Sequence, residues 1–377
     1  MLSLATKLDF MTRRMITLAD YLAWLLIDPS KFTIIRKEKI KKIIVFHLGA
    51  IGEILASTPL LPVLKKEFNA EIQYIVPESK KEIIEYNPYI SKILIYQNDF
   101  KKNIEILKKE KFDLAIIVHP SSLNATLTCL LAGIKYRIGG FRGIKDGLNL
   151  FFTRRMIDLR KRHAIQSNLD IIRTIGLDNK NPKMEFYLSK EDMEKSQKLL
   201  KKLNVKDYAI LHPGSSSYTK LKYPSRLWPP ERFAEVADYL IKKHNLKILI
   251  TGSPDERSIG DDIIKLIKNK EKVINIAGKL SIRETASILP KSKLLVIPST
   301  GIAHIATALD AKMVHLSGPD GHHWHPWITG DNCIALQHNE VCTGCEKIYC
   351  RKKTIECMKA ITVSEVINAA ESLLKKK

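Results

Sequence analysis

The chain has 377 residues, enough for two α/β domains with full hydrophobic cores. Lysine and arginine number 62 against 40 acidic residues, so the formal net charge of +22 predicts an anionic partner: nucleic acid, a membrane surface or a phosphorylated substrate. Nucleic acid is not expected, because the sequence contains neither a groove-reading helix module nor an RNA-binding signature.

Residues 1–30 predict an amphipathic helix. Leucine and methionine recur there at alternating spacings of four and three residues, which places on one helix face Leu4, Leu8, Met11, Met15, Leu18, Leu22 and Leu25. The apolar run from Tyr21 to Ile27 is too short to span a bilayer, and no small-residue cleavage site follows it. A basic run from Lys31 to Lys42 comes next. The pattern favours equally a contact of residues 1–42 with a membrane surface and a helix docked on its own domain or on a second subunit.

The first half then alternates between strands and helices. Apolar runs predict strands at 42–47, 71–76 and 113–118, with a helix from Ile54 to Phe68 after the first strand. This alternation is typical of a parallel sheet with helices on both faces. Ligands of such sheets bind beyond the carboxyl ends of the strands.

Two polar turns of the first half lie at such ends. The turn at residues 49–52 leads to Glu53 in the first turn of a helix. This position suits a general base for a hydroxyl nucleophile, and equally a carboxylate stabilised by the helix N-terminus. The three-glycine dinucleotide pattern and the P-loop signature are both absent from the sequence, which disfavours NAD and P-loop nucleotide sites. After the strand at 113–118, His119 and Ser121 belong to the second polar turn.

A polar stretch at residues 179–183 predicts a domain boundary. We expect an N-terminal arm at 1–40, domains at 41–180 and 181–340, and a cysteine-containing segment with a helix at 341–377. The second half repeats the plan of the first, with predicted strands at 208–211, 247–250, 273–276, 294–297 and 313–316.

Polar turns in the second half predict a diphosphate site. The first amides of a helix have no internal partner and the helix dipole is positive there, so the Ser299-Thr300-Gly301 turn suits phosphate. Three cations, Lys220, Lys222 and Arg226, follow the turn at residues 214–217 and would stabilise a diphosphate leaving group. The alternatives are an ordinary capped helix and solvent-facing cations. The candidate donor-binding residues in these turns are Gly214, Ser215, Lys220, Lys222, Arg226, Gly252, Ser253, Ser299, Thr300 and Gly301.

Four of the six cysteines lie close together near the end of the chain: Cys342, Cys345, Cys350 and Cys357. The first pair has the C-x-x-C spacing of metal or redox sites, whereas the later spacings match no common zinc module closely. Three interpretations of the four cysteines are therefore kept as alternatives: a structural zinc site, a disulfide pair and reduced thiols packed in the C-terminal segment. The other two cysteines, Cys129 and Cys333, have the character of small core residues.

Four segments together resemble a known family. They are residues 46–59, residues 212–214 with 226–233, residues 251–253, and residues 299–306. In this order they resemble the ADP-heptose:lipopolysaccharide heptosyltransferases, glycosyltransferase family 9, from about residue 41 to the end of the chain. The ending that runs from Cys342 to Cys357 and Met358 is similar to a tail of some members.

The resemblance implies a GT-B fold, in which two Rossmann-like domains face each other across a crevice. It implies inverting transfer of heptose from ADP-heptose to a lipopolysaccharide core or related lipid-linked acceptor, without a metal or other cofactor, at the inner face of the cytoplasmic membrane. Glu53 takes the position of the family's base, where Asp is usual, and Arg226 that of a phosphate-binding Lys. Ser299 stands where the family has Asp, and His304 takes the position of the family's His. Lys220 or Lys222 is able to share the role of Arg226, and Glu256 or Asp255 takes the position of the family's acidic nucleotide contact. The resemblance also implies that the acceptor binds the first domain, where the candidates are His119 and Ser121. The alternatives are a GT-B enzyme with another nucleotide sugar and a non-catalytic membrane-associated adaptor.

Overall fold

A computed structural model of the chain describes residues 34–118, 123–141, 151–157, 162–215, 224–318, 325–327, 330–342, 345, 347 and 349–376. The chain divides into two compact units, unit 1 up to Pro182 and unit 2 from Lys183. The amphipathic helix predicted for residues 1–30 lies outside the described residues. Within the described ranges, no helix has the length and apolar character needed to cross a bilayer.

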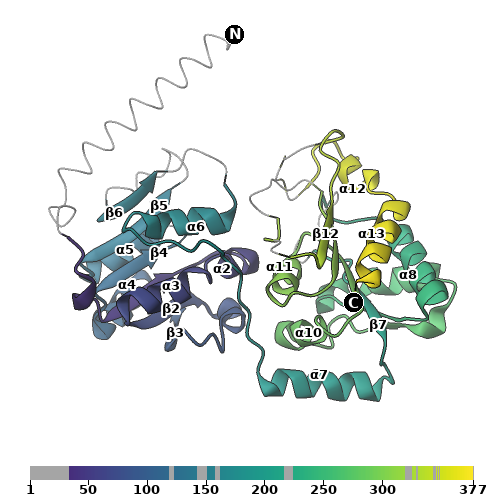
Figure 1. Cartoon of the computed structure of the whole chain (residues 1–377), viewed down its shortest axis with the longest axis horizontal. Helices are drawn as coiled ribbons and strands as arrows, with labels where there is room; N and C mark the ends of the chain where they lie inside the picture. The colour runs from purple at the N-terminus through teal and green to yellow at the C-terminus, as the bar shows by residue number, and fades with distance from the viewer. Residues whose placement is uncertain are drawn as a thin grey trace, which may run out of the picture. The chain divides into compact units, whose positions relative to one another are not determined.

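Unit 1 is built on a six-stranded parallel sheet with the order β3-β2-β1-β4-β5-β6 (Figure 1). Its strands are β1 (Lys42–Phe46), β2 (Glu71–Pro77), β3 (Lys92–Tyr96), β4 (Leu114–Ile117), β5 (Tyr136–Phe141) and β6 (Arg154–Ile157). The three strands predicted in this half are confirmed as β1, β2 and β4. All four residues of β4 are buried, as is expected for a central strand covered on both faces.

The helices of unit 1 are η2 (Lys37–Lys39), α2 (Ile51–Leu55), α3 (Leu60–Phe68), η3 (Glu78–Ile83), α4 (Phe100–Glu110), α5 (Leu123–Leu131) and α6 (Ala164–Arg173). The prediction of one helix from Ile54 to Phe68 was wrong, because the chain leaves the helix between α2 and α3. Pro59 has no backbone N–H to continue the helical ladder. The hydroxyls of Ser57 and Thr58 donate back to the carbonyls of Ile54 and Leu55 at 2.7 Å each, which closes the first helix there.

Unit 2 has a second six-stranded parallel sheet, with the order β12-β11-β10-β7-β8-β9. Its strands are β7 (Tyr208–Leu211), β8 (Lys247–Ile250), β9 (Val273–Asn275), β10 (Leu294–Pro298), β11 (Met313–Leu316) and β12 (Cys333–Leu336). The five strands predicted for this half are confirmed, and β12 is added at the edge.

Helices cover both faces of the unit 2 sheet, with α8 and α13 on one side and α10 and α11 on the other (Figure 1). They are α7 (Lys190–Lys202), α8 (Pro230–His244), η7 (Pro254–Glu256), α9 (Arg257–Leu266), η8 (Lys270–Lys272), α10 (Ile282–Ile288), α11 (Gly301–Ala308), α12 (Glu356–Ala360) and α13 (Val363–Lys375). The last helix packs into the core of unit 2 through Val366, Ala370 and Leu373. The indole N–H of the buried Trp228 donates to the Ile361 carbonyl at 3.0 Å and ties this ending to the start of α8.

The two sheets have the same strand order. Counted from the first strand of each unit, both run 3-2-1-4-5-6, the order of Rossmann-like domains. The order reverses between β1 and β4 in unit 1 and between β7 and β10 in unit 2. Because ligands bind at such switch points, the turns after these four strands are the places to look for function. The predicted class of two Rossmann-like α/β domains is confirmed for each unit.

Candidate functional site

Glu53 lies at the switch point of unit 1. It is the third residue of α2, and its Oε2 accepts the N–H of Ala50 at 2.6 Å. The preceding turn is tight, because a Cβ on Gly49 would lie 2.1 Å from Glu53 Oε2 and 2.6 Å from the ring of His47. The Gly49 N–H in turn donates to His47 Nδ1 at 2.9 Å. The carboxylate therefore caps its own helix while it lies, partly exposed, over the carboxyl end of β1.

The loop after β4 starts at the same switch point. Strand β4 pairs with β1, and the N–H of Val118 donates to the carbonyl of Phe46 at 3.3 Å. The predicted acceptor residues His119 and Ser121 follow directly and lie outside the described residues. Their assignment stays a prediction.

The turns after β7 and β10 meet at the switch point of unit 2. The hydroxyl of Ser215 donates to the carbonyl of Ser299 at 3.3 Å. Thr300 is the N-cap residue of α11, yet its side chain makes no cap hydrogen bond. Its hydroxyl is buried and has no hydrogen-bond partner among the residues that the structure describes. Since the first turn of α11 from Gly301 also carries no acidic residue, this helix start is suited to an anionic ligand.

A third turn, after β8, is braced by Glu256. The Glu256 side chain is buried, and its Oε2 accepts the N–H of Ser253 at 2.7 Å. A Cβ on Gly214 would lie 2.3 Å from the Glu256 carboxyl carbon, and one on Gly252 would lie 3.1 Å from Oε2. Two of the predicted glycines are therefore needed for the close approach of this carboxylate, which joins the turns after β7 and β8.

Buried histidines complete the unit 2 site. His212 shares a hydrogen bond of 2.9 Å between its Nδ1 and Thr251 Oγ1, and burial lowers the pKa of His212, while the charge of Glu256 opposes the shift. On β11, His315 Nε2 lies 3.2 Å from Ser299 Oγ. His315 was not predicted as a site residue, although a histidine inside the apolar run 313–316 is a sequence signal of a buried polar contact.

Arg226 lies within electrostatic reach of the Ser299–His315 pair. Burial lowers the pKa of His315 to about 3, and the electrostatic interactions of His315 with His325 and Arg226 lower it further. The His315 and His325 rings are 6.0 Å apart, and His325 Nε2 lies 2.8 Å from the hydroxyl of Ser317. With Ser299 in place of the family's Asp, the pair with His315 is neutral at physiological pH, so the cationic character of this corner is kept.

The structure thus gathers most of the predicted donor residues at the carboxyl ends of β7, β8 and β10. These residues are Gly214, Ser215, Arg226, Gly252, Ser253, Glu256, Ser299, Thr300 and Gly301. His304 lies one turn further along α11 and is half-buried. Lys220 and Lys222 lie outside the described residues.

The four C-terminal cysteines line one cavity of about 150 Å³ in unit 2. All six cysteines of the chain are free thiols. In the described ranges no three His, Cys, Asp or Glu side chains are placed to hold a metal ion as they stand. Cys129 is fully buried and Cys333 is half-buried in β12, as expected for small packing residues.

Comparison with known proteins gives matches along most of the chain. The lipopolysaccharide core heptosyltransferase OpsX of Haemophilus influenzae is 24% identical over 288 residues, which cover 73% of this chain and 78% of that protein. The crystal structure of a glycosyltransferase family 9 protein from Veillonella parvula has a TM-score of 0.75 at 22% identity, covering 89% of this chain and 98% of that one. The structure of E. coli ADP-heptose lps heptosyltransferase II has a TM-score of 0.71 at 18% identity and covers 88% of this chain and 98% of that one.

These structures share the fold of the two units, so the predicted GT-B class is confirmed at the level of the fold. The family model described as glycosyltransferase family 9 (heptosyltransferase) matches residues 101–356, which include the unit 2 site and three of the four C-terminal cysteines. The chain therefore belongs to glycosyltransferase family 9, the heptosyltransferase family.

Proposed function

We propose that this protein is an inverting heptosyltransferase that moves heptose from ADP-heptose to a lipopolysaccharide core or related lipid-linked acceptor. Its family supports the reaction class, and the activities for which its relatives are named support the donor and the acceptor. One observation of the structure carries the proposal: the Thr300 hydroxyl at the start of α11 is buried and has no hydrogen-bond partner in the described part of the chain. This helix start carries no acidic residue and lies in the corner that Arg226 makes cationic.

In this proposal unit 2 binds the donor. The amides at the start of α11 and the Thr300 hydroxyl hold the diphosphate, and Arg226 adds a charge-assisted contact. Gly214 keeps the turn after β7 free of a side chain, so the backbone of this turn can approach the donor. These groups stabilise the negative charge that grows on the leaving diphosphate, the role that a metal ion has in other transferases, so transfer proceeds without a catalytic metal.

Glu53 of unit 1 acts as the base. The acceptor hydroxyl oxygen attacks the anomeric carbon from the side opposite to the diphosphate, and the bond between that carbon and the phosphate oxygen breaks. ADP leaves with the bonding electron pair, and the hydroxyl proton passes to the Glu53 carboxylate. The configuration at the anomeric carbon inverts, because bond formation and cleavage occur on opposite faces. General-base assistance of this kind contributes about 10²–10⁴ in rate.

A donor panel tests the proposal. We expect ADP-heptose to raise the unfolding temperature of the protein more than UDP-, GDP- or other ADP-sugars, because a ligand that binds the folded state stabilises it by mass action. Mass spectrometry and anomeric NMR of a core oligosaccharide acceptor should then show one added heptose with inverted configuration. Transfer from another nucleotide sugar would replace the donor assignment, and donor binding without any transfer would favour the adaptor alternative.

We propose in addition that residues 1–42 hold the enzyme on an anionic membrane surface, next to its lipid-linked acceptor. The apolar face and the basic run should act together, with about 1 kcal/mol for each basic residue near the surface. Sedimentation with anionic vesicles should show weaker binding for a protein without residues 1–30, and full-length binding should fall as salt rises. Equal binding of both forms would favour a helix docked on the protein itself or on a second subunit.

A further inference from the structure

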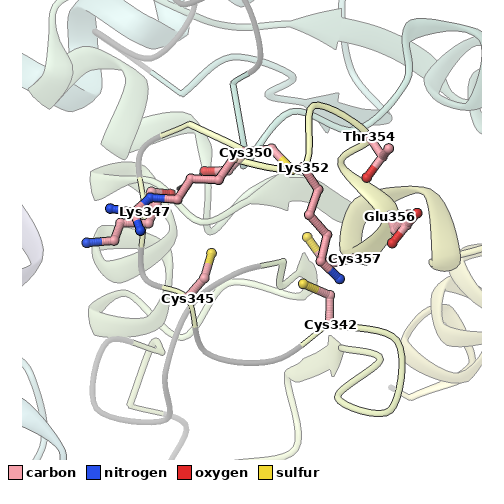
Figure 2. Close-up of a pocket in the computed structure, with 10 residues that line it drawn as sticks. Cys342, Cys345, Lys347, Cys350, Lys352, Thr354, Glu356 and Cys357 are labelled. Carbon is pink, nitrogen blue, oxygen red and sulfur yellow. Dashed lines mark hydrogen bonds between the residues drawn. The ribbon is translucent and has the colours of Figure 1, made fainter.

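The feature that the transfer reaction leaves unexplained is the cavity lined by Cys342, Cys345, Cys350 and Cys357. Figure 2 shows the sulfurs of Cys342, Cys345 and Cys357 directed into the space between them. All four cysteines line this one cavity. Four free thiols around one cavity are the ligand set of a structural zinc site.

The backbone around Cys350 is shaped to hold a thiolate. The Ile355 N–H donates to the Cys350 sulfur at 3.4 Å. Lys353 and Ile355 have φ angles of +61° and +48°, the left-handed region that a β-branched residue rarely adopts. A strained loop that aims an amide at a sulfur is typical of a cysteine that ligates a metal.

The charges around the cavity fit the same ligand. Four thiolates around a divalent cation leave a net charge of −2, and the cavity is also lined by Lys347, Arg351 and Lys352. These cations favour the thiolate forms that bind metal.

We propose that the four cysteines bind one structural Zn²⁺ in tetrahedral geometry. As they stand, no three His, Cys, Asp or Glu side chains of the described residues are at ligand spacing, so the thiols close on the ion by rotation. Rotation is open to them because Cys345 is exposed and Cys342 and Cys350 are half-buried. The sulfurs come to about 2.3 Å from the metal.

The zinc has a structural consequence for the donor corner. The Ser225 hydroxyl donates to the carbonyl of Lys347, and Pro224 pairs with Tyr349 as an antiparallel bridge. The cysteine segment is thus joined to the residues directly before Arg226. We infer that zinc fixes the position of Arg226, a consequence that rests on the proposed donor-binding role of this arginine.

Metal content tests the site directly. Full-length protein grown with zinc should contain about one zinc per chain, and Cys345→Ser should lose it. Cys345 is exposed, so this replacement has little structural effect unless the thiol ligates a metal. Cys333→Ser is the matched control, since Cys333 does not line the cavity, and it should keep its zinc. Cobalt exchanged for zinc should give the visible absorption of a tetrahedral thiolate site in the parent protein and in the control only.

Three results would overturn the site: zinc content unchanged in Cys345→Ser, iron as the bound metal, or a disulfide within the cluster in the mass spectrum of non-reduced protein. The link to Arg226 has its own readout. Cys345→Ser should weaken ADP-heptose binding at least fivefold, and equal affinity with zinc lost would refute the link while the site stands. If the parent protein fails to bind ADP-heptose at all, the proposed function fails, and the zinc content still decides the metal site.

Discussion

The two units have the same strand order and opposite chemistry at their switch points. In unit 1 the start of α2 is occupied by the chain's own carboxylate, because Glu53 accepts the Ala50 N–H at 2.6 Å. In unit 2 the start of α11 carries no acid, and the Thr300 hydroxyl is left without a partner among the described residues. The fold supplies a helix start suited to anions in both units. The residue in the first helical turn decides whether the protein fills that position itself or leaves it to a ligand.

Glu256 in unit 2 caps a turn in the same way as Glu53 in unit 1. Glu256 accepts the Ser253 N–H at 2.7 Å and packs against Gly214, much as Glu53 packs against Gly49. Glu256 is only 3% exposed, whereas Glu53 is partly exposed. The two carboxylates share one cap geometry and differ in exposure, and the proposed role as base requires a carboxylate that an acceptor hydroxyl can reach.

The largest expected effect tests whether Glu53 is more than a cap. Glu53→Gln keeps a side-chain oxygen that can accept the Ala50 N–H, so the turn should persist, whereas the amide takes up no proton. We expect kcat to fall by about 10²-fold or more, with donor affinity unchanged. Steady-state kinetics and donor titration measure the two quantities.

The control for this prediction is another helix-capping glutamate. Glu284 accepts the Ser281 N–H at 2.8 Å at the start of α10, away from both switch points. Glu284→Gln should leave kcat within twofold of the parent value. A Glu53→Gln enzyme that turns over as fast as this control would reduce Glu53 to a structural cap.

The next effect concerns the cationic corner of unit 2. Arg226→Ala removes a charge-assisted contact worth about 1.5–3 kcal/mol, so ADP-heptose should bind about 10- to 150-fold more weakly. Calorimetric titration measures the change, with Lys242→Ala, an exposed cation on α8, as the control. If Arg226→Ala binds normally, alanine variants of Lys220 and Lys222 become the tests of the diphosphate contact.

Periodicity was enough to predict the central strands, because a strand buried on both faces is apolar throughout. The missed strands are those whose pattern is weaker: β3, β5, β6 and β12 lie at or near the sheet edges, and β5 contains Gly139 and Gly140. The break before α3 was missed because the apolar spacing continues across Pro59. The spacing of apolar residues indicates which side chains are buried, but it does not indicate where the backbone hydrogen bonds of a helix end.

The grouping of the candidate site residues was predictable where a turn follows a strand, since strand order then brings the turns together. This holds for Ser215 and Ser299, which are 84 residues apart in sequence and share a hydrogen bond. The contact between the turns after β7 and β8 depends on the close packing of Glu256 against Gly214. The approach of His315 to Ser299 depends on the register between β10 and β11. Such contacts between distant residues leave no local sequence signal.

The acid sensitivity of unit 2 follows from His315. Its pKa lies at about 3 in the folded protein and near 6.5 when unfolded, so the unfolded chain binds a proton first as pH falls. Stability is therefore complete above about pH 6.5 and declines as pH falls toward 3, with a loss of about 2 kcal/mol at pH 5. The lowered pKa of His212 adds to the loss in the same direction. Urea unfolding at pH 7 and pH 5 measures it, and His315→Gln should show a smaller difference between the two.

The smallest expected effect concerns the Thr300 hydroxyl, and it shows whether this hydroxyl contacts the donor or stabilises the fold. Thr300→Val replaces a buried hydroxyl that has no partner among the described residues with a methyl group of similar shape. The free energy of unfolding should stay the same or rise, because an unpaired buried hydroxyl costs about 1–3 kcal/mol. Donor affinity should nonetheless fall by about two- to tenfold, the worth of one neutral hydrogen bond.

Thr307→Val on the same helix is the control, since the Thr307 hydroxyl already donates to the carbonyl of Ala303 at 3.0 Å. A Thr300→Val protein that loses stability but keeps its donor affinity would show that this hydroxyl serves the fold, and the contrast between the two helix starts would then rest on Arg226 alone.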